Sequence, residues 1–185
     1  MLALDCMLVA ALTATPAYSE PVRFGARSGL TVASHSEEGG LIFGGTAGLL
    51  ASIPIGEGSF MIEPALVFSM KGGGWGAGEG GEDKHYDYVE VPVLLRYGAK
   101  GSYFVGAGIA PALLVHEWHV SNGGTSNSSA KPFDLSVVGQ VGREWTHFRL
   151  DLGLEVGIIQ ADDSHSDAPP SNKNRAAIVA MSWFL

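Results

Sequence analysis

The sequence has little cysteine and little charge. Its single cysteine, Cys6, lies in an apolar N-terminal stretch, and charged residues make up 16% of the 185 residues. A disordered chain of this length would carry more charge and fewer aliphatic residues, so the composition predicts a folded chain. At this length we expect one domain.

Basic clusters and long apolar runs are also lacking. The net charge is −8 and lysine and arginine are scattered, which argues against nucleic acid as a partner. Beyond the N-terminal stretch, no segment has the ~20 consecutive apolar residues that a membrane helix requires. The absences therefore exclude a nucleic-acid-binding protein and a helical membrane protein.

Residues 1–19 are predicted to be a cleaved signal peptide, which leaves residues 20–185 as the mature domain. The apolar centre runs from Cys6 to Leu12, and Ala17-Tyr18-Ser19 offers small residues at the two positions that a signal peptidase reads. Asp5 stands where a lysine or arginine is expected, so Met7 is an alternative start. After cleavage the chain would have no thiol, which suits an oxidising periplasm.

The rest of the sequence repeats its apolar residues with a period of two. This is clearest from His147 to Ile159, where one face carries only apolar side chains and the other carries His147, Arg149, Asp151 and Glu155 with glycines. A helix would scatter both sets around its circumference, so the segment is predicted to be a strand. The apolar set is Phe148, Leu150, Leu152, Leu154, Val156 and Ile158.

The same alternation predicts eight strands, each close to the ~9–11 residues of a tilted membrane strand. They are Val22–Val32, Leu41–Ile53, Phe60–Lys71, Tyr88–Tyr97, Tyr103–Val115, Phe133–Glu144, His147–Ile159 and Arg175–Leu185. Long polar connections alternate with short ones, as between extracellular loops and periplasmic turns. The long ones are Ser34–Gly40, Gly72–His85, Glu117–Lys131 and Ala161–Asn174. The predicted fold is all-β: an eight-stranded antiparallel up-and-down transmembrane β-barrel in the outer membrane.

Alternation alone leaves open a soluble lipocalin-like barrel, which carries its apolar face inside. The polar face here is rich in glycine and alanine, as the tight interior of an eight-stranded barrel requires, and it carries charges of both signs. The predicted interior charges are Arg23, Arg27, Glu63, Lys71, Glu90, Arg96, Arg149, Asp151 and Glu155. Pro64, Pro92 and Pro111 lie inside predicted strands, and each requires a bulge or a local break.

Aromatic residues near the strand ends are predicted to form interfacial girdles. They are Phe24, Phe43, Phe60, Tyr86, Tyr97, Tyr103, Phe133, Trp145, Phe148 and Trp183. The chain ends on an apolar alternation that includes Met181, Trp183 and Leu185, beside Phe184. Such a last strand resembles the signal that the barrel-assembly machinery reads.

The segment Tyr88-Val89-Glu90-Val91-Pro92-Val93-Leu94-Leu95-Arg96-Tyr97, followed by Tyr103-Phe104-Val105-Gly106-Ala107-Gly108, resembles the central signature of the PorT-like outer-membrane β-barrel family. Phe24-Gly25-Ala26-Arg27-Ser28-Gly29-Leu30 and Glu63-Pro64 are also similar to it. The resemblance implies an eight-stranded barrel in the outer membrane. It implies no defined chemistry and no catalytic residues to carry over.

One motif suggests an enzyme instead. His119 lies two residues before Ser121, which resembles the motif of lipid A deacylases, where a histidine activates the serine and an acidic residue orients the histidine. Asp134 would be the acid here, although that family has glutamate and a slightly different position. The alternative interpretation is a polar loop whose histidine and serine face water.

No cofactor or metal is predicted. His116, Glu117 and His119, and Asp162, Asp163, His165 and Asp167, have ligand-type side chains without a defined metal spacing. The glycine-rich stretch Gly72–Gly81 lacks the Gly-Lys-Ser/Thr ending of a phosphate-binding loop and is predicted to be a flexible extracellular loop.

These features together predict a small monomeric outer-membrane protein that is not an enzyme. Its role would be structural or interactive, through extracellular loops that meet an unidentified ligand. Its predicted partners are outer-membrane lipid and the barrel-assembly machinery. No open pore is expected, because side chains fill an eight-stranded barrel. The alternatives are the deacylase-like esterase and the soluble ligand-binding barrel.

Overall fold

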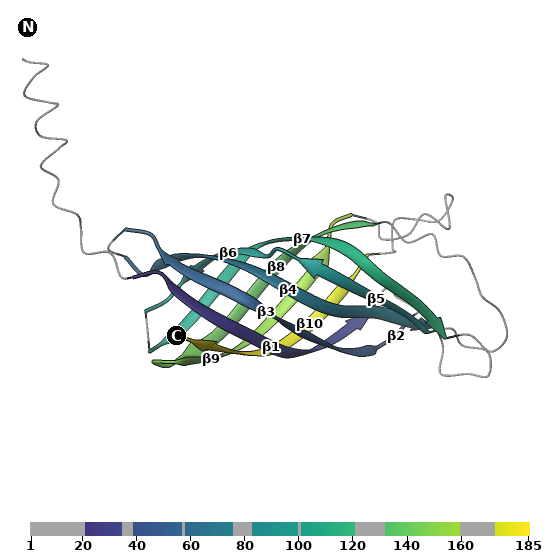
Figure 1. Ribbon diagram of the computed structural model, residues 1–185, viewed down its shortest axis with the longest axis horizontal. Helices are drawn as coiled ribbons and strands as arrows, with labels where there is room; N and C mark the ends of the chain where they lie inside the picture. Colours follow the sequence, from purple (N-terminus) through teal and green to yellow (C-terminus); the bar gives the residue numbers. More distant parts are fainter. Residues whose placement is uncertain are drawn as a thin grey trace, which may run out of the picture.

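The computed structural model describes residues 21–34, 39–56, 58–75, 83–99, 101–120, 132–159 and 173–185, which form a closed antiparallel β-barrel (Figure 1). The predicted signal peptide, residues 1–19, lies outside the described residues. The strands are β1 (Arg23–Ser34), β2 (Gly39–Gly40), β3 (Ile42–Pro54), β4 (Phe60–Trp75), β5 (Asp83–Glu90), β6 (Val93–Tyr97), β7 (Tyr103–Val120), β8 (Phe133–Glu144), β9 (Phe148–Gly157) and β10 (Arg175–Phe184).

These strands fill eight positions around the barrel. Both β2 and β3 pair with β4, and β5 and β6 lie one after the other between β4 and β7. Each of these eight positions pairs with the next along the chain, and β1 pairs with β10 to close the barrel. The predicted eight-stranded antiparallel up-and-down barrel is therefore confirmed.

The three prolines share one interruption of the hydrogen-bond ladder. Val91 and Pro92 separate β5 from β6, where the sequence predicted a single strand. On either side of this break, the Ala65 amide donates to the Pro92 carbonyl at 2.9 Å and the Val91 amide donates to the Pro111 carbonyl at 2.9 Å. Pro64 and Pro111 stay within continuous strands beside the break, where the ladder is already interrupted.

Several strands extend beyond the limits that the sequence predicted, and β5 begins at Asp83 rather than at Tyr88. β4 continues to Trp75 and β7 continues to Val120, so parts of the predicted loops Gly72–His85 and Glu117–Lys131 are strand. Gly72, Gly73 and Gly74 pair in register with residues 85, 84 and 83 of β5. Backbone hydrogen bonds alone make these pairs, and glycines have no side chains whose alternation could predict a strand.

The connections differ in length between the two ends of the barrel. The short connections, residues 55–59, 98–102 and 145–147, join strands at one end, and the strand ends that the long connections join lie at the other. Gly56 and Gly101 in the short turns have φ of 63° and 77°, which favours glycine. The C-terminus lies at the short-turn end, where the Leu185 amide donates to the Phe24 carbonyl at 3.0 Å (Figure 1). Within the described residues, no helix has the length and apolar character to cross a membrane.

Candidate functional site

The outer face of the barrel is apolar, and the interior is polar. In β9, Leu150, Leu152, Leu154 and Val156 are 47–62% exposed, whereas the alternate residues from Arg149 to Gly157 are buried. The other strands expose apolar side chains in the same alternation, with Leu30, Leu49, Leu66, Leu95, Ile109, Val137 and Val179 as examples. This arrangement is the reverse of a soluble lipocalin-like barrel.

Three arginines and two glutamates fill the interior at the short-turn end. We call Arg23, Arg96, Arg149, Glu63 and Glu144 the basal cluster. Arg149 donates to both oxygens of Glu63, at 2.8 and 2.6 Å, and to Glu144 at 3.0 Å. Arg23 and Arg96 also form ion pairs with Glu144. Both glutamates are buried, and Glu144 balances arginines from three different strands.

Two phenylalanine rings pack against the basal cluster. The guanidinium carbons of Arg96 and Arg149 lie 4.6 and 5.0 Å from the centroid of the Phe104 ring. Those of Arg23 and Arg149 lie 4.2 and 4.7 Å from the centroid of the Phe184 ring. Guanidinium planes stack well on aromatic faces, so the rings hold the arginines while the two glutamates offset two of the three positive charges. The short-turn end of the interior is thus filled.

Further ion pairs lie toward the long-connection end. Arg27 donates to both oxygens of Asp151, at 2.9 and 2.6 Å. Lys71 pairs with two carboxylates, Glu90 and Glu155, each at 2.5 Å. All nine charges that the sequence assigned to the interior therefore face it, and each takes part in an ion pair.

The sequence interpretation omitted Glu144 from these charges. The alternation of β8 indicates that Glu144 faces the interior, because Asp134, Ser136, Gln140 and Glu144 share one face. The three arginine partners of Glu144 come from distant parts of the chain. The ion pairs of Glu144 therefore could not be derived from its own strand.

Two of the three residues proposed for an esterase, His119 and Asp134, are not brought together. Asp134 is buried in the interior, where it accepts hydrogen bonds from the Asn174 amide group at 2.7 Å and from the Leu135 backbone amide at 2.8 Å. In register it lies opposite Ala112, seven residues before His119 in β7. At a rise of about 3.3 Å per residue, His119 lies on the order of 20 Å away. Ser121 lies outside the described residues.

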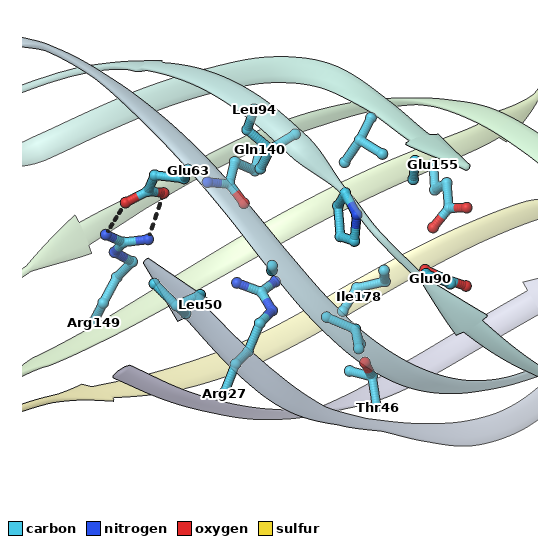
Figure 2. A pocket seen from close by; sticks show the side chains of 15 residues that line it. Arg27, Thr46, Leu50, Glu63, Glu90, Leu94, Gln140, Arg149, Glu155 and Ile178 are labelled. Carbon is cyan, nitrogen blue, oxygen red and sulfur yellow. Dashed lines mark hydrogen bonds and ion pairs between the residues drawn. The ribbon is translucent and has the colours of Figure 1, made fainter. Parts of the chain in front are cut away.

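A small cavity lies in the middle of the interior, between the basal cluster and the Lys71 ion pairs. Its volume is about 50 Å³, and Figure 2 shows Arg27 and Gln140 pointing into it and the paired Arg149 and Glu63 beside it. The Gln140 amide nitrogen is buried and has no hydrogen-bond partner among the described residues. This volume suits a few water molecules rather than an organic ligand.

The described residues contain no group of three or more histidine, cysteine, aspartate or glutamate side chains that could hold a metal ion. Of the ligand-type residues that the sequence singled out, His116 and Glu117 lie in β7. The set Asp162, Asp163, His165 and Asp167 lies outside the described residues. The predicted girdle needs one correction: Tyr86 is 2% exposed and points into the barrel, because it lies on the same face of β5 as Tyr88 and Glu90.

No protein-family model and no curated protein matches the chain. Among solved structures, the outer membrane protein OprG from Pseudomonas aeruginosa is similar, with a TM-score of 0.56, 13% identity and coverage of 90% of this chain and 97% of OprG. Neisserial surface protein A (NspA) has a TM-score of 0.55, 16% identity and coverage of 89% of this chain and 97% of NspA. The chain thus has the fold of small outer-membrane β-barrels. Membership of the PorT-like family stays a prediction.

Proposed function

We propose that the chain is a monomeric outer-membrane β-barrel without an open pore or enzymatic activity, which presents its long connections at the cell surface for interaction. The observation that carries this proposal is the combination of an apolar outer face with an interior of buried ion pairs. Many leucine, valine and phenylalanine side chains are exposed on the outer face, and lipid around the whole barrel would shield them from water.

The closed ladder supports a membrane location for a second reason. In lipid every backbone amide and carbonyl group needs a partner within the protein, and a closed barrel leaves no unpaired edge. Pairing of β1 with β10 removes the only edges that an up-and-down sheet would have. The similarity to OprG, itself an outer membrane protein, supports the same location. Export would require the predicted signal peptide, residues 1–19.

The orientation follows from the lengths of the connections. Outer-membrane barrels have short turns on the periplasmic side and longer loops outside. The basal cluster and the C-terminus would then lie toward the periplasm, and the long connections would lie outside.

We retain the PorT-like resemblance as a proposal. Two residues of its signature have structural roles here: Glu90 pairs with Lys71, and Pro92 lies at the break between β5 and β6.

The membrane location is tested by heat-modifiability on a detergent gel. Protein from isolated outer membranes is expected to migrate faster when unboiled than when boiled, because a barrel closed by a continuous ladder stays folded in detergent. The C-terminally truncated chain without β10 serves as a control, since it cannot close and should show one position only. A soluble periplasmic protein without a mobility shift would contradict the proposal.

The closed interior predicts an absence of ion conduction. In a planar lipid bilayer the purified barrel is expected to produce no stable conductance steps, because the basal cluster with Phe104 and Phe184 blocks the interior at the short-turn end. The variant Phe104→Ala with Phe184→Ala, which opens space beside the arginines, is the matched comparison. Steady conductance of the unaltered protein would show that the interior is open.

A further inference from the structure

Arg143 is a cation on the apolar outer face. It belongs to β8 and lies in register between Tyr103 of β7 and Leu150 of β9. Its side chain is exposed, on the same face as Val137 and Val141. The nine interior charges named above each take part in an ion pair, but Arg143 has no carboxylate within ion-pair distance among the residues that the structure describes. An unneutralised charge on this face requires an explanation.

Two aromatic rings hold the guanidinium group at the surface. Its central carbon lies 5.3 Å from the centroid of the Tyr103 ring and 5.0 Å from that of the Trp145 ring. The Trp145 ring is itself stacked on Phe148, with 4.3 Å between centroids and 9° between planes. Contact with ring faces positions a guanidinium group but does not use its N–H donors, which lie in its own plane. The charge is thus held in place and available.

The depth of this group matches the lipid headgroups. Arg143 is the second-last residue of β8, at the short-turn end, and Tyr103 and Trp183 beside this end are 72% and 57% exposed. Exposed tyrosine and tryptophan side chains mark the boundary between hydrocarbon and water. With the orientation proposed above, this boundary is the periplasmic one.

We propose that Arg143, held by Tyr103 and Trp145, binds the phosphodiester group of a glycerophospholipid in the periplasmic leaflet. A guanidinium fork matches two phosphate oxygens, and the Tyr103 hydroxyl and Trp145 indole N–H are further donors at the same boundary. Leu150 and Val141 next to Arg143 would contact the acyl chains. This inference rests on the proposed membrane location.

The test is native mass spectrometry of the heat-modifiable barrel in detergent, titrated with phosphatidylglycerol. One-to-one adducts are expected for the unaltered protein, and Arg143→Gln should weaken binding about tenfold, as for the loss of a charge-assisted hydrogen bond. Arg143→Lys, which retains the charge but not the fork, should bind with intermediate strength. Arg175→Gln makes the same charge change on an exposed residue at the opposite end and should bind normally.

The inference would be overturned by adducts that do not depend on Arg143, by an equal weakening with Arg175→Gln, or by diacylglycerol with the same acyl chains that binds as well as phosphatidylglycerol. Displacement by soluble glycerophosphoglycerol at equal concentration would assign the site to free phosphate esters instead of lipid. Failure of the membrane proposal would be recognised separately, because no heat-modifiable form would exist to titrate.

Discussion

Replacement of Leu154 by arginine is expected to lower the free energy of unfolding in a phospholipid bilayer by about 2–4 kcal/mol. Leu154 lies in the middle of the outward-facing row of β9 and is 62% exposed. With the proposed location, an arginine there would face hydrocarbon near the midplane. The measurement is a denaturant titration of the barrel folded into phosphatidylcholine vesicles, followed by tryptophan fluorescence.

Phe24→Arg is the depth control for this experiment. Phe24 is 61% exposed and lies next to the start of β1, at the short-turn end. Arginine near the interface costs only about 0–1 kcal/mol, so the two variants should differ clearly. Equal stability of Leu154→Arg and the unaltered protein would mean that this face contacts water.

Glu144→Leu is expected to lower the free energy of unfolding by about 3–5 kcal/mol, the usual cost of removing one partner of a buried ion pair. Glu144 is 0% exposed and pairs with Arg23, Arg96 and Arg149, so its loss leaves an excess of buried positive charge. The same vesicle titration measures the change. The temperature at which the sample must be heated before the band moves to its unfolded position provides a second measurement, and it should be lower for the variant.

The double variant Glu144→Leu with Arg96→Met provides the control. Removal of one arginine together with its carboxylate reduces the excess charge, so the double variant should be more stable than Glu144→Leu alone. Additive losses from the two single changes would show that Glu144 and Arg96 do not interact. Asp134→Asn is a comparison at the other end, where the carboxylate has an amide partner, and its effect should be smaller.

The faces of the strands could be predicted from the sequence because side-chain direction in a strand is a local property. Each residue points away from its neighbours in the chain, so Arg149, Asp151 and Glu155 could be assigned to the interior without knowledge of any other strand. The fold class followed from the same alternation, together with the lengths of the connections.

Pairing could not be predicted in this way. Glu144 meets Arg23 across 121 positions of the chain and Arg96 across 48, and these contacts depend on the register of strands that are not neighbours. Gly72–Gly74 extend β4 through backbone bonds that leave no trace in residue type. Likewise, the break shared by Pro64, Pro92 and Pro111 exists only when three strands lie side by side.

The junction of β1 with β10 makes assembly of the barrel an all-or-none event. Gly25 lies opposite Phe184 in register, so the first and last described strands meet only when the whole chain has been delivered. The Arg27–Asp151 ion pair also joins residues 124 positions apart. Ring closure and neutralisation of these charges therefore occur late, after a large loop-closure cost. Until then, two strand edges stay unpaired and several interior charges stay uncompensated.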